Sequence, residues 1–269
     1  MTDLDLCAAQ YCSVAGDLNA NLDRHAQVMR LAAHHGAKFL LFPELSLTGY
    51  EPSLASNLAL NADSQLLEPL RDLAKQSGMT TVLGAPLRQS GAEEVFIGAL
   101  VFCADGSQIT YTKQHLHPGE EVVFTPGQGG PLVTVDAGQI ALSVCADFSH
   151  ASHAQAAAQE GAGVYAASVL ISDNGYDHDS GLLQGYARQH AFGVLMANHG
   201  GVSGGWACAG RSAFWSPDGE LVVSAAGAGD CLVMARRRRG AWEGEVLQAL
   251  YSAPDINRAT EAVIVNLHA

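Results

Sequence analysis

A cysteine at the end of a short apolar run is the first residue in this sequence that could do chemistry. Residues 140–144 (IALSV) predict a buried strand, which ends at Cys145 and leads into a polar, small-residue segment suited to start a helix. A thiol between a strand end and a helix N-terminus lies where α/β folds place reactive groups. Unpaired amides there favour an anion, which predicts a lowered pKa for Cys145. Taken alone, however, a cysteine is more often a small buried hydrophobe.

Two other ionisable residues follow apolar runs of the same kind. Glu44 comes after residues 39–43 (FLLFP), and burial there would raise the pKa of its carboxyl toward neutrality and prepare it to exchange protons. Lys113 ends the run of residues 109–112 (ITYT), and Glu120 lies in the loop beyond it. Each of these is singly compatible with an ordinary surface residue. It is their combination with Cys145 that indicates a catalytic group.

The elements that must position these side chains alternate between strand and helix patterns. Asp17 is predicted to cap a first helix that Gly36 ends, and further helices are predicted at residues 63–76, 149–159 and 180–190. The middle of the chain favours a hairpin around the turn at residues 105–106. The final segment, residues 240–269, is predicted to be irregular and a possible oligomer contact. The predicted strands are residues 4–11, 38–42, 79–83, 95–103, 108–112, 132–135, 140–144, 164–169, 194–197, 212–215, 221–224 and 231–235.

Composition narrows the class of protein. The 269 residues are 48% hydrophobic and only 15% charged, which is typical of a compact folded chain. The net charge of -13 argues against nucleic acid or an anionic membrane as a partner. The basic run of residues 236–239 favours a solvated edge or an oligomer contact. Six scattered cysteines, no signal-like start and no long apolar stretch predict a reduced, cytoplasmic protein without a membrane segment.

Three separated segments together resemble the nitrilase superfamily of carbon–nitrogen hydrolases. Residues 42–50 (FPELSLTGY) resemble the family's segment around its catalytic glutamate. Residues 111–116 (YTKQHL), with 119–120 and 124–127, resemble the segment around its lysine and second glutamate. Residues 143–147 (SVCAD) resemble the nucleophile segment. They occur in the family's order and spacing, and residues 210–212 with 217–219 add a weaker fourth match.

The resemblance implies a role for each matched residue. Cys145 is expected to attack an amide carbonyl and form a thioester, while Glu44 relays the proton to the leaving nitrogen and later activates water. Lys113 and the backbone N–H of Ala146 are expected to stabilise the oxyanion, and Glu120 to orient the lysine or the water. Tyr50 is expected in the pocket wall, along with the loop after Lys113 and residues 170–180. No metal and no cofactor is implied.

Two differences from the family's sequence pattern limit the classes of substrate that we expect. True nitrilases of the family have Trp-Glu after the cysteine, whereas this chain has Ala146 and Asp147, the amidase-type version. We therefore expect a small amide or carbamoyl substrate rather than a nitrile. Many amidase branches continue with Arg-Phe-Pro-Glu, in which an arginine can pair with a substrate carboxylate. This chain has residues 148–151 (FSHA) instead, which disfavours dicarboxylic monoamides.

Three other functions fit these residues less well. His115, His117, His150 and His153 could suggest a zinc hydrolase, but the sequence lacks a His-Glu-x-x-His motif. A non-catalytic binding or assembly member of the same fold is disfavoured because Glu44, Lys113 and Cys145 are all present. A papain-like protease needs different surroundings for its cysteine.

The resemblance also implies the architecture. We expect an α/β fold of the nitrilase type, a four-layer α-β-β-α sandwich, formed by one carbon–nitrogen hydrolase domain over residues 1–269. Family members commonly pair through helices near the nucleophile, so a homodimer or larger homo-oligomer is expected. The expected partner is otherwise a small amide alone.

Overall fold

The computed structural model describes residues 3–88 and 91–248. Two β-sheets contain all the named strands of this part. The first has the order β13-β12-β1-β2-β3-β4-β5 and the second the order β11-β10-β9-β8-β7-β6. The strands of the first sheet are β1 (Leu4–Gln10), β2 (Phe39–Leu41), β3 (Thr80–Leu87), β4 (Phe96–Phe102), β5 (Gln108–Thr112), β12 (Cys231–Arg238) and β13 (Ala241–Gln248). Those of the second are β6 (Val133–Val135), β7 (Gly138–Val144), β8 (Val164–Val169), β9 (Gly193–Asn198), β10 (Ala213–Trp215) and β11 (Leu221–Ser224).

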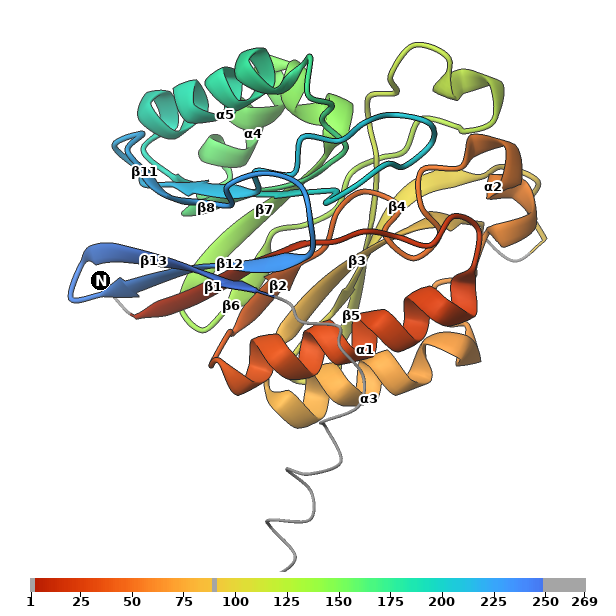
Figure 1. Ribbon diagram of the computed structural model, residues 1–269, viewed down its shortest axis with the longest axis horizontal. Coiled ribbons are helices and arrows are strands. Elements are labelled where there is room, and N and C mark those ends of the chain that lie inside the picture. Colours follow the sequence, from red (N-terminus) through yellow and green to blue (C-terminus); the bar gives the residue numbers. More distant parts are fainter. Residues whose placement is uncertain (1–2, 89–90, 249–269) are drawn as a thin grey trace, which may run out of the picture.

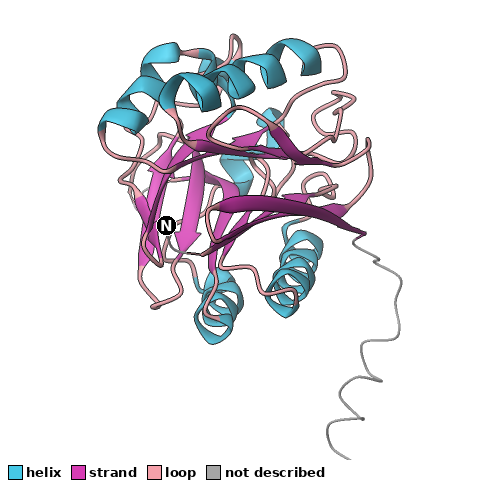
Figure 2. Ribbon diagram, turned by 90° about the vertical axis from the view of Figure 1, so that its left-hand side faces the viewer, coloured by secondary structure: helices cyan, strands magenta, loops and turns pink. Residues whose placement is uncertain are grey.

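Helices cover the outer face of each sheet (Figure 1). Helices α1 (Leu18–His34) and α3 (Glu68–Ser77) pack on the first sheet, and α4 (Ala151–Gln159) and α5 (Tyr176–His190) pack on the second. Figure 2 shows the four layers edge-on, with the two sheets stacked face to face between the helices. The predicted α-β-β-α sandwich is confirmed.

The apolar residues divide into three buried groups that follow these layers. Alternate residues of a strand point to opposite faces, so Leu6 and Ala8 of β1 enter the core between the sheets, while Cys7 and Ala9 face α1 and α3. The β7, β8 and β9 strands supply the other side of the inter-sheet core. Because β2 and β8 are buried on both faces, their sequences lack the polar alternation of a half-exposed strand.

Most predicted elements lie where the sequence places them, and Asp17 caps α1 by accepting a hydrogen bond from the Ala20 N–H. Two predictions were wrong. Residues 240–269 are not wholly irregular, because residues 241–248 form β13 in full register with β12, while residues 249–269 lie outside the described part. The segment predicted as one helix at 63–76 is a short turn at Gln65–Leu67 followed by α3. Helix α2 (Pro52–Leu58) and the turn at Cys145–Ser149 were not predicted.

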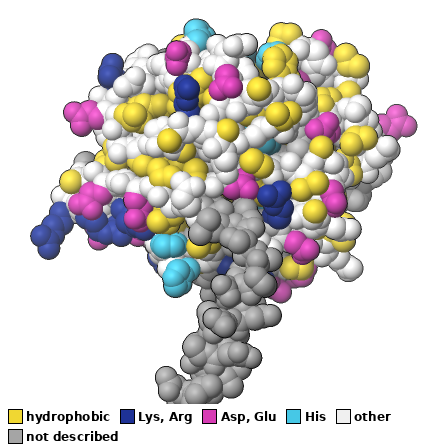
Figure 3. Space-filling view, viewed as in Figure 1, with side chains coloured by type: hydrophobic (Ala, Val, Ile, Leu, Met, Phe, Trp, Pro, Cys, Tyr) yellow, Lys and Arg dark blue, Asp and Glu magenta, His cyan; other side chains and the backbone are white. Residues whose placement is uncertain are grey.

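The basic run lies at the exposed end of the β12–β13 hairpin. Figure 3 shows the basic side chains there interspersed with acidic ones. Arg236 and Arg238 both pair with Asp5, and Arg236 also pairs with Glu245. The run is thus a charge-paired hairpin end rather than a continuous basic patch.

Candidate active site

The predicted ionisable residues stand at the ends of strands from both sheets. Glu44 follows β2 and Lys113 follows β5 in the first sheet, and Cys145 follows β7 in the second. The two sheets face one another, so these strand ends meet at one cavity. Glu44, Glu120 and Cys145 all line it, and Lys113 lies directly beneath, bonded to both carboxylates.

Lys113 bridges the two glutamates. Its Nζ lies 2.7 Å from Glu44 Oε1 and 2.9 Å from the Glu120 carboxylate. The Lys113 side chain is fully buried, as are Glu44 and Glu120. A buried ammonium is stable only when it is paired, so this arrangement fixes the amine in one position.

Besides Lys113, two further donors hold the carboxylate of Glu120. Glu120 Oε1 accepts a hydrogen bond of 2.8 Å from the Tyr50 hydroxyl, and Oε2 accepts one of 2.8 Å from the His117 N–H. The turn that delivers Glu120 begins at Gly119, whose φ of 99° favours glycine. Tyr50 is in turn fixed by its N–H, which donates to Ser203 Oγ at 2.8 Å.

Two hydrogen bonds from segments of the second sheet hold the backbone around Glu44. His199, at the end of β9, donates from Nε2 to the Glu44 carbonyl at 2.8 Å. Ser168 of β8 donates from its hydroxyl to the Phe42 carbonyl at 2.8 Å. Ser168 belongs to the second sheet and His199 directly follows one of its strands, so the position of Glu44 depends on how the two sheets dock.

Cys145 occupies a sharp turn between β7 and the following helical segment. Its φ of 42° is unusual for a residue with a side chain, and such strain is typical of functional turns. The thiol remains partly exposed to the cavity and lies 3.6 Å from the Leu170 carbonyl oxygen. Ala146, the residue expected to supply an oxyanion N–H, also lines the cavity.

Burial sets the protonation of the two opposed charges. Burial, with a smaller contribution from the negative charge of Glu120, raises the pKa of Glu44 to about 7 against the opposing effect of the Lys113 charge. For Lys113, burial alone would lower the pKa, but the charges of Glu44, Cys145 and Glu120 together raise it well above its usual value. The lysine is therefore a permanent cation, whereas Glu44 can take up and release a proton near neutral pH.

The prediction of a lowered pKa for Cys145 was wrong. Burial raises the pKa of this thiol, and the nearby Glu44 charge raises it further, while Lys113 only partly compensates. The helical segment after Cys145 is a single short turn, so it supplies little of the expected stabilisation of an anion. A neutral thiol must therefore give its proton to a base when it attacks.

Asp147 connects the lysine segment to the cysteine segment. One of its oxygens accepts hydrogen bonds from the N–H groups of Gln114 and His115, at 3.0 and 2.8 Å. The other accepts from the Tyr111 hydroxyl at 2.7 Å and the Val144 N–H at 3.1 Å. This fully buried carboxylate therefore ties the chain after β5 to the end of β7. The sequence showed the residue but not this structural role.

The histidines considered for zinc are arranged differently from a metal site. The rings of His115 and His150 stack at 3.8 Å, and His153 bonds to the hydroxyls of Tyr111 and Tyr165. Within residues 3–88 and 91–248, no three His, Cys, Asp or Glu side chains are placed to share a metal ion.

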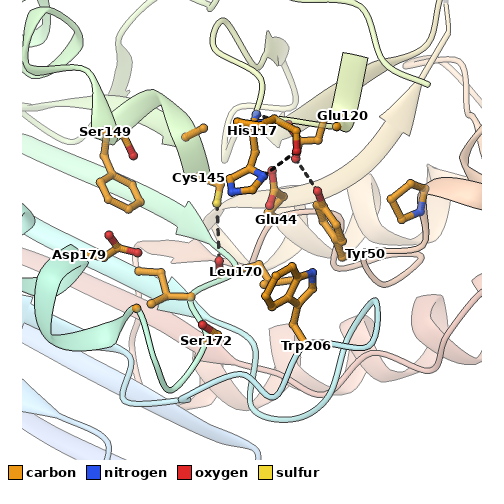
Figure 4. A pocket seen from close by; sticks show the side chains of 17 residues that line it. Glu44, Tyr50, His117, Glu120, Cys145, Ser149, Leu170, Ser172, Asp179 and Trp206 are labelled. Carbon is orange, nitrogen blue, oxygen red and sulfur yellow. Dashed lines mark hydrogen bonds between the residues drawn. The ribbon is translucent and has the colours of Figure 1, made fainter. Parts of the chain in front are cut away.

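The cavity is about 450 Å³, large enough for a small organic molecule. Figure 4 shows Cys145, Glu44 and Glu120 grouped on one side, near Tyr50. The wall includes the predicted Tyr50, the loop after Lys113 and residues from 170–180. Trp206 was not predicted, because its only signal in the sequence is a tryptophan next to a glycine-rich loop. The lining residues are Glu44, Tyr50, Pro52, His117, Pro118, Gly119, Glu120, Cys145, Ala146, Phe148, Ser149, Leu170, Ile171, Ser172, Gly175, Asp179 and Trp206.

Comparison with known proteins identifies the family. A family model described as carbon-nitrogen hydrolase matches residues 6–243. The chain belongs to this family of enzymes, as the resemblance to the nitrilase superfamily implied, and its similarities place it in the amidase branch. The (R)-stereoselective amidase of Pseudomonas sp. is 24% identical over 216 residues, which cover 78% of this chain and 76% of that protein.

Solved amidase structures share the fold. An amidase from Nesterenkonia sp. is 27% identical with a TM-score of 0.79, covering 87% of this chain and 90% of that one. A mutant of the Nesterenkonia sp. AN1 amidase in complex with butyramide is 26% identical with a TM-score of 0.79, covering 88% and 92%. Another mutant, 27% identical with a TM-score of 0.79 and covering 87% and 90%, shows covalent addition of the acetamide moiety of fluoroacetamide at the active site cysteine. Cys145 occupies the position of a catalytic cysteine.

Proposed function

We propose that this enzyme hydrolyses a non-peptide C–N bond in a small amide or carbamoyl compound through a thioester on Cys145. The observation that carries the proposal is the buried Lys113 amine, held 2.7 Å from Glu44 and 2.9 Å from Glu120 beside the Cys145 thiol. This arrangement supplies a nucleophile, a base and a fixed cation around one cavity. The covalent adduct on the cysteine of the Nesterenkonia amidase supports the role of Cys145.

The first half of the reaction forms the thioester. Glu44 accepts the Cys145 proton as the sulfur attacks the carbonyl carbon, because the neutral thiol needs a base and Glu44 titrates near neutrality. The oxyanion receives hydrogen bonds from Lys113 and the Ala146 N–H, and losing one such donor costs roughly 3–4 kcal/mol of barrier. Protonated Glu44 then gives its proton to the leaving nitrogen, and ammonia or an amine departs.

The second half releases the acid. Glu44, again ionised, removes a proton from water as it attacks the thioester carbonyl, and the returning proton restores the Cys145 thiol. Glu120 keeps the Lys113 amine in place and is fixed in turn by Tyr50 and the His117 N–H. Tyr50 also lines the substrate cavity.

The test combines product release with trapping of the intermediate. Ammonia is measured over a panel of aliphatic, aryl, ω- and carbamoyl amides, and hydroxylamine is added so that an acyl-thioester is diverted to a hydroxamate. We expect both products from the wild type and neither from Cys145→Ala. Cys103→Ser, which alters a half-buried cysteine elsewhere, should behave as the wild type. Hydrolysis that survives in Cys145→Ala would refute the mechanism.

The same amide panel, with the corresponding nitriles added, separates the alternative functions. A true nitrilase would convert the matching nitriles faster than the amides, and we expect the reverse because Ala146 and Asp147 follow the cysteine. A binding or assembly member would convert neither and would leave Cys145 unacylated.

The assembly and location of the enzyme remain predictions. We propose a homodimer or larger homo-oligomer, as the family resemblance implies, and sedimentation equilibrium that shows only monomer would contradict it. We also propose a cytoplasmic location, which the six scattered cysteines support because all of them are free thiols. None of the helices in residues 3–88 and 91–248 is both long and apolar enough to cross a membrane.

A further inference from the structure

The charged residues of the catalytic cavity are mostly acidic. Glu44, Glu120 and Asp179 line it, and no lysine or arginine of the described chain does. The positive charge of the Lys113 amine beneath is offset by the two carboxylates that pair with it. His117 also lines the cavity, and its Nδ1 lies 3.1 Å from the Pro118 carbonyl oxygen. A substrate carboxylate would therefore meet repulsion in this cavity, and a cation would meet attraction.

Asp179 is the acid that the proposed mechanism does not use. It lies in the first turn of α5, and its side chain is 27% exposed. One oxygen, Oδ1, lies 2.9 Å from Nδ1 of His178, whose own side chain is 77% exposed. Within the described residues, the other oxygen, Oδ2, has no hydrogen-bond partner. A partly desolvated carboxylate that lines a cavity and has one oxygen without a hydrogen bond is suited to accept one from a bound cation.

The position of Asp179 relative to the reacting groups suits recognition rather than catalysis. In the view of Figure 4, the Cys145 thiol lies between Asp179 on one side and Tyr50 on the other. Leu170, Ile171 and Phe148 add apolar surface to the same cavity. A cavity of about 450 Å³ with this lining suits a short hydrocarbon chain that has a carbonyl at the cysteine and a charged group farther along.

Trp206 adds a second surface for a cation. The side chain lines the cavity, and the residue is 51% exposed, which is unusual for so large an aromatic residue. Its segment is fixed to the catalytic side by the bond from the Tyr50 N–H to Ser203 Oγ and by one of 3.2 Å from the Gly204 N–H to Glu51. The face of an indole ring attracts ammonium groups. A carboxylate and an exposed indole in one cavity therefore favour the same kind of ligand.

We propose that Asp179 is a specificity-determining residue that selects amides carrying an ammonium group on their acyl or amine part. This inference rests on the amidase function proposed above. It accounts for the lack of an arginine after the cysteine, because a site built for a cation has no use for a partner of substrate carboxylates.

Matched substrate pairs test the proposal. The ratio of kcat/KM for 5-aminopentanamide to that for pentanamide places the ammonium on the acyl part. The ratio for N-(3-aminopropyl)acetamide to that for N-butylacetamide places it on the amine part. We expect at least one ratio to exceed one in the wild type and to fall about tenfold in Asp179→Asn. Asp177→Asn, an exposed acid in the same helical turn, should keep the wild-type ratio.

Two results would overturn the proposal. One is a wild type with no preference for the ammonium member of either pair. The other is an Asp179→Asn variant that keeps the wild-type ratio. Asp179→Lys adds a charge reversal, which we expect to raise kcat/KM for glutaramate relative to pentanamide.

Binding to an inactive enzyme separates this proposal from the proposed function. Calorimetry with Cys145→Ala is expected to show tighter binding of 5-aminopentanamide or N-(3-aminopropyl)acetamide than of its uncharged partner, and Cys145→Ala/Asp179→Asn should lose that preference. If no amide is hydrolysed by the wild type but this binding preference holds, the proposed function fails and Asp179 recognition stands. If amides are hydrolysed and the preference is absent, only the role of Asp179 fails.

Discussion

At the scale of single residues, burial and neighbouring charges set the pKa values of Lys113, Cys145 and Glu44, and these pKa values control the chemistry of the site. Lys113 keeps its proton because two carboxylates surround it, and Cys145 keeps its proton because burial and Glu44 oppose a thiolate. Glu44 alone of the three is brought near pH 7. The thiol is therefore not activated in advance but is deprotonated during attack, which makes the protonation state of Glu44 decisive for the rate.

The pH dependence of kcat/KM should report this carboxyl. Glu44 must be ionised to accept the thiol proton, and burial raises its pKa from 4.5 to about 7. For pentanamide, whose charge does not change, we expect kcat/KM to fall about tenfold per pH unit below this value. Because the Glu120 charge raises the pKa of Glu44, Glu120→Gln should shift the midpoint to lower pH, despite a lower rate.

Glu121, the exposed residue next to Glu120, provides the control for the pH profile. Glu121→Gln should leave the midpoint of the pH profile in place, because Glu121 lies on the surface. A wild-type profile that stays flat between pH 6 and 8 would contradict the assignment of Glu44 as the base.

At the scale of elements, Glu44 depends on close backbone packing between its turn and β3. Gly84 of β3 lies directly against this turn, and a Cβ built on Gly84 would come within 2.3 Å of the Leu45 nitrogen and 2.6 Å of the Pro43 oxygen. These are backbone atoms that cannot rotate away. The glycine is thus required for space, in a strand whose other residues are packed side chains.

Gly84→Ala should therefore impair both activity and stability. We expect kcat/KM to fall at least about tenfold, because the added methyl displaces Glu44 from Lys113 and Cys145. We also expect the free energy of unfolding to fall by roughly 1–3 kcal/mol through overpacking, measured by urea denaturation.

Gly185 in helix α5 provides the control for Gly84→Ala. A Cβ on Gly185 meets no atom within 4 Å, so Gly185→Ala should keep wild-type activity and raise the free energy of unfolding by about 0.5–1 kcal/mol through helix propensity. Wild-type kcat/KM in Gly84→Ala would show that the close packing does not position Glu44.

At the scale of the whole molecule, the docking of the two sheets decides whether a site exists. The Glu44 turn belongs to the first sheet, yet His199 and Ser168 of the second sheet hold its backbone. His199 is fully buried, which lowers its pKa from 6.5 to about 4, against the opposing effect of its bond to the Glu44 carbonyl. His25, buried under the first sheet, has its pKa lowered to about 3 for the same reason.

This burial predicts a loss of stability in mild acid. The folded pKa of His199 lies below its unfolded value, so the unfolded chain binds more protons between pH 6.5 and about 4, and the free energy of unfolding falls as pH falls through that window. Glu44 acts with the opposite sign, because its pKa is raised on folding. A comparison of variants, rather than the wild-type slope, isolates His199.

His199→Gln keeps a donor for the Glu44 carbonyl but removes the titrating ring. We expect the dependence of unfolding free energy on pH to weaken in this variant by up to about 1.4 kcal/mol per pH unit between pH 6 and 4, measured by urea denaturation. His34→Gln, at an exposed helix end, should leave the dependence unchanged. An unchanged dependence in His199→Gln would mean that this histidine is not buried neutral.

Local patterns determined much of this protein. The apolar runs before Glu44 and Cys145 predicted strands because a strand buried on both faces must be apolar throughout. The segments around Glu44, Lys113 and Cys145 carried the family resemblance, and the structure brings the three residues to one cavity. Helix α2 and β13 escaped prediction, since α2 is short and the β13 segment reads as irregular by itself, and pairing with β12 supplies its order.

The residue types of the site and the class of enzyme were thus already present in the amino-acid sequence, because motif chemistry is local. Tertiary structure alone decided the raised pKa of the Cys145 thiol, the hydrogen bond from His199 that holds the Glu44 backbone, and the entry of Trp206 into the cavity wall. Desolvation and contact between distant segments arise only when the two sheets pack against one another, and neither is encoded in the neighbours along the chain.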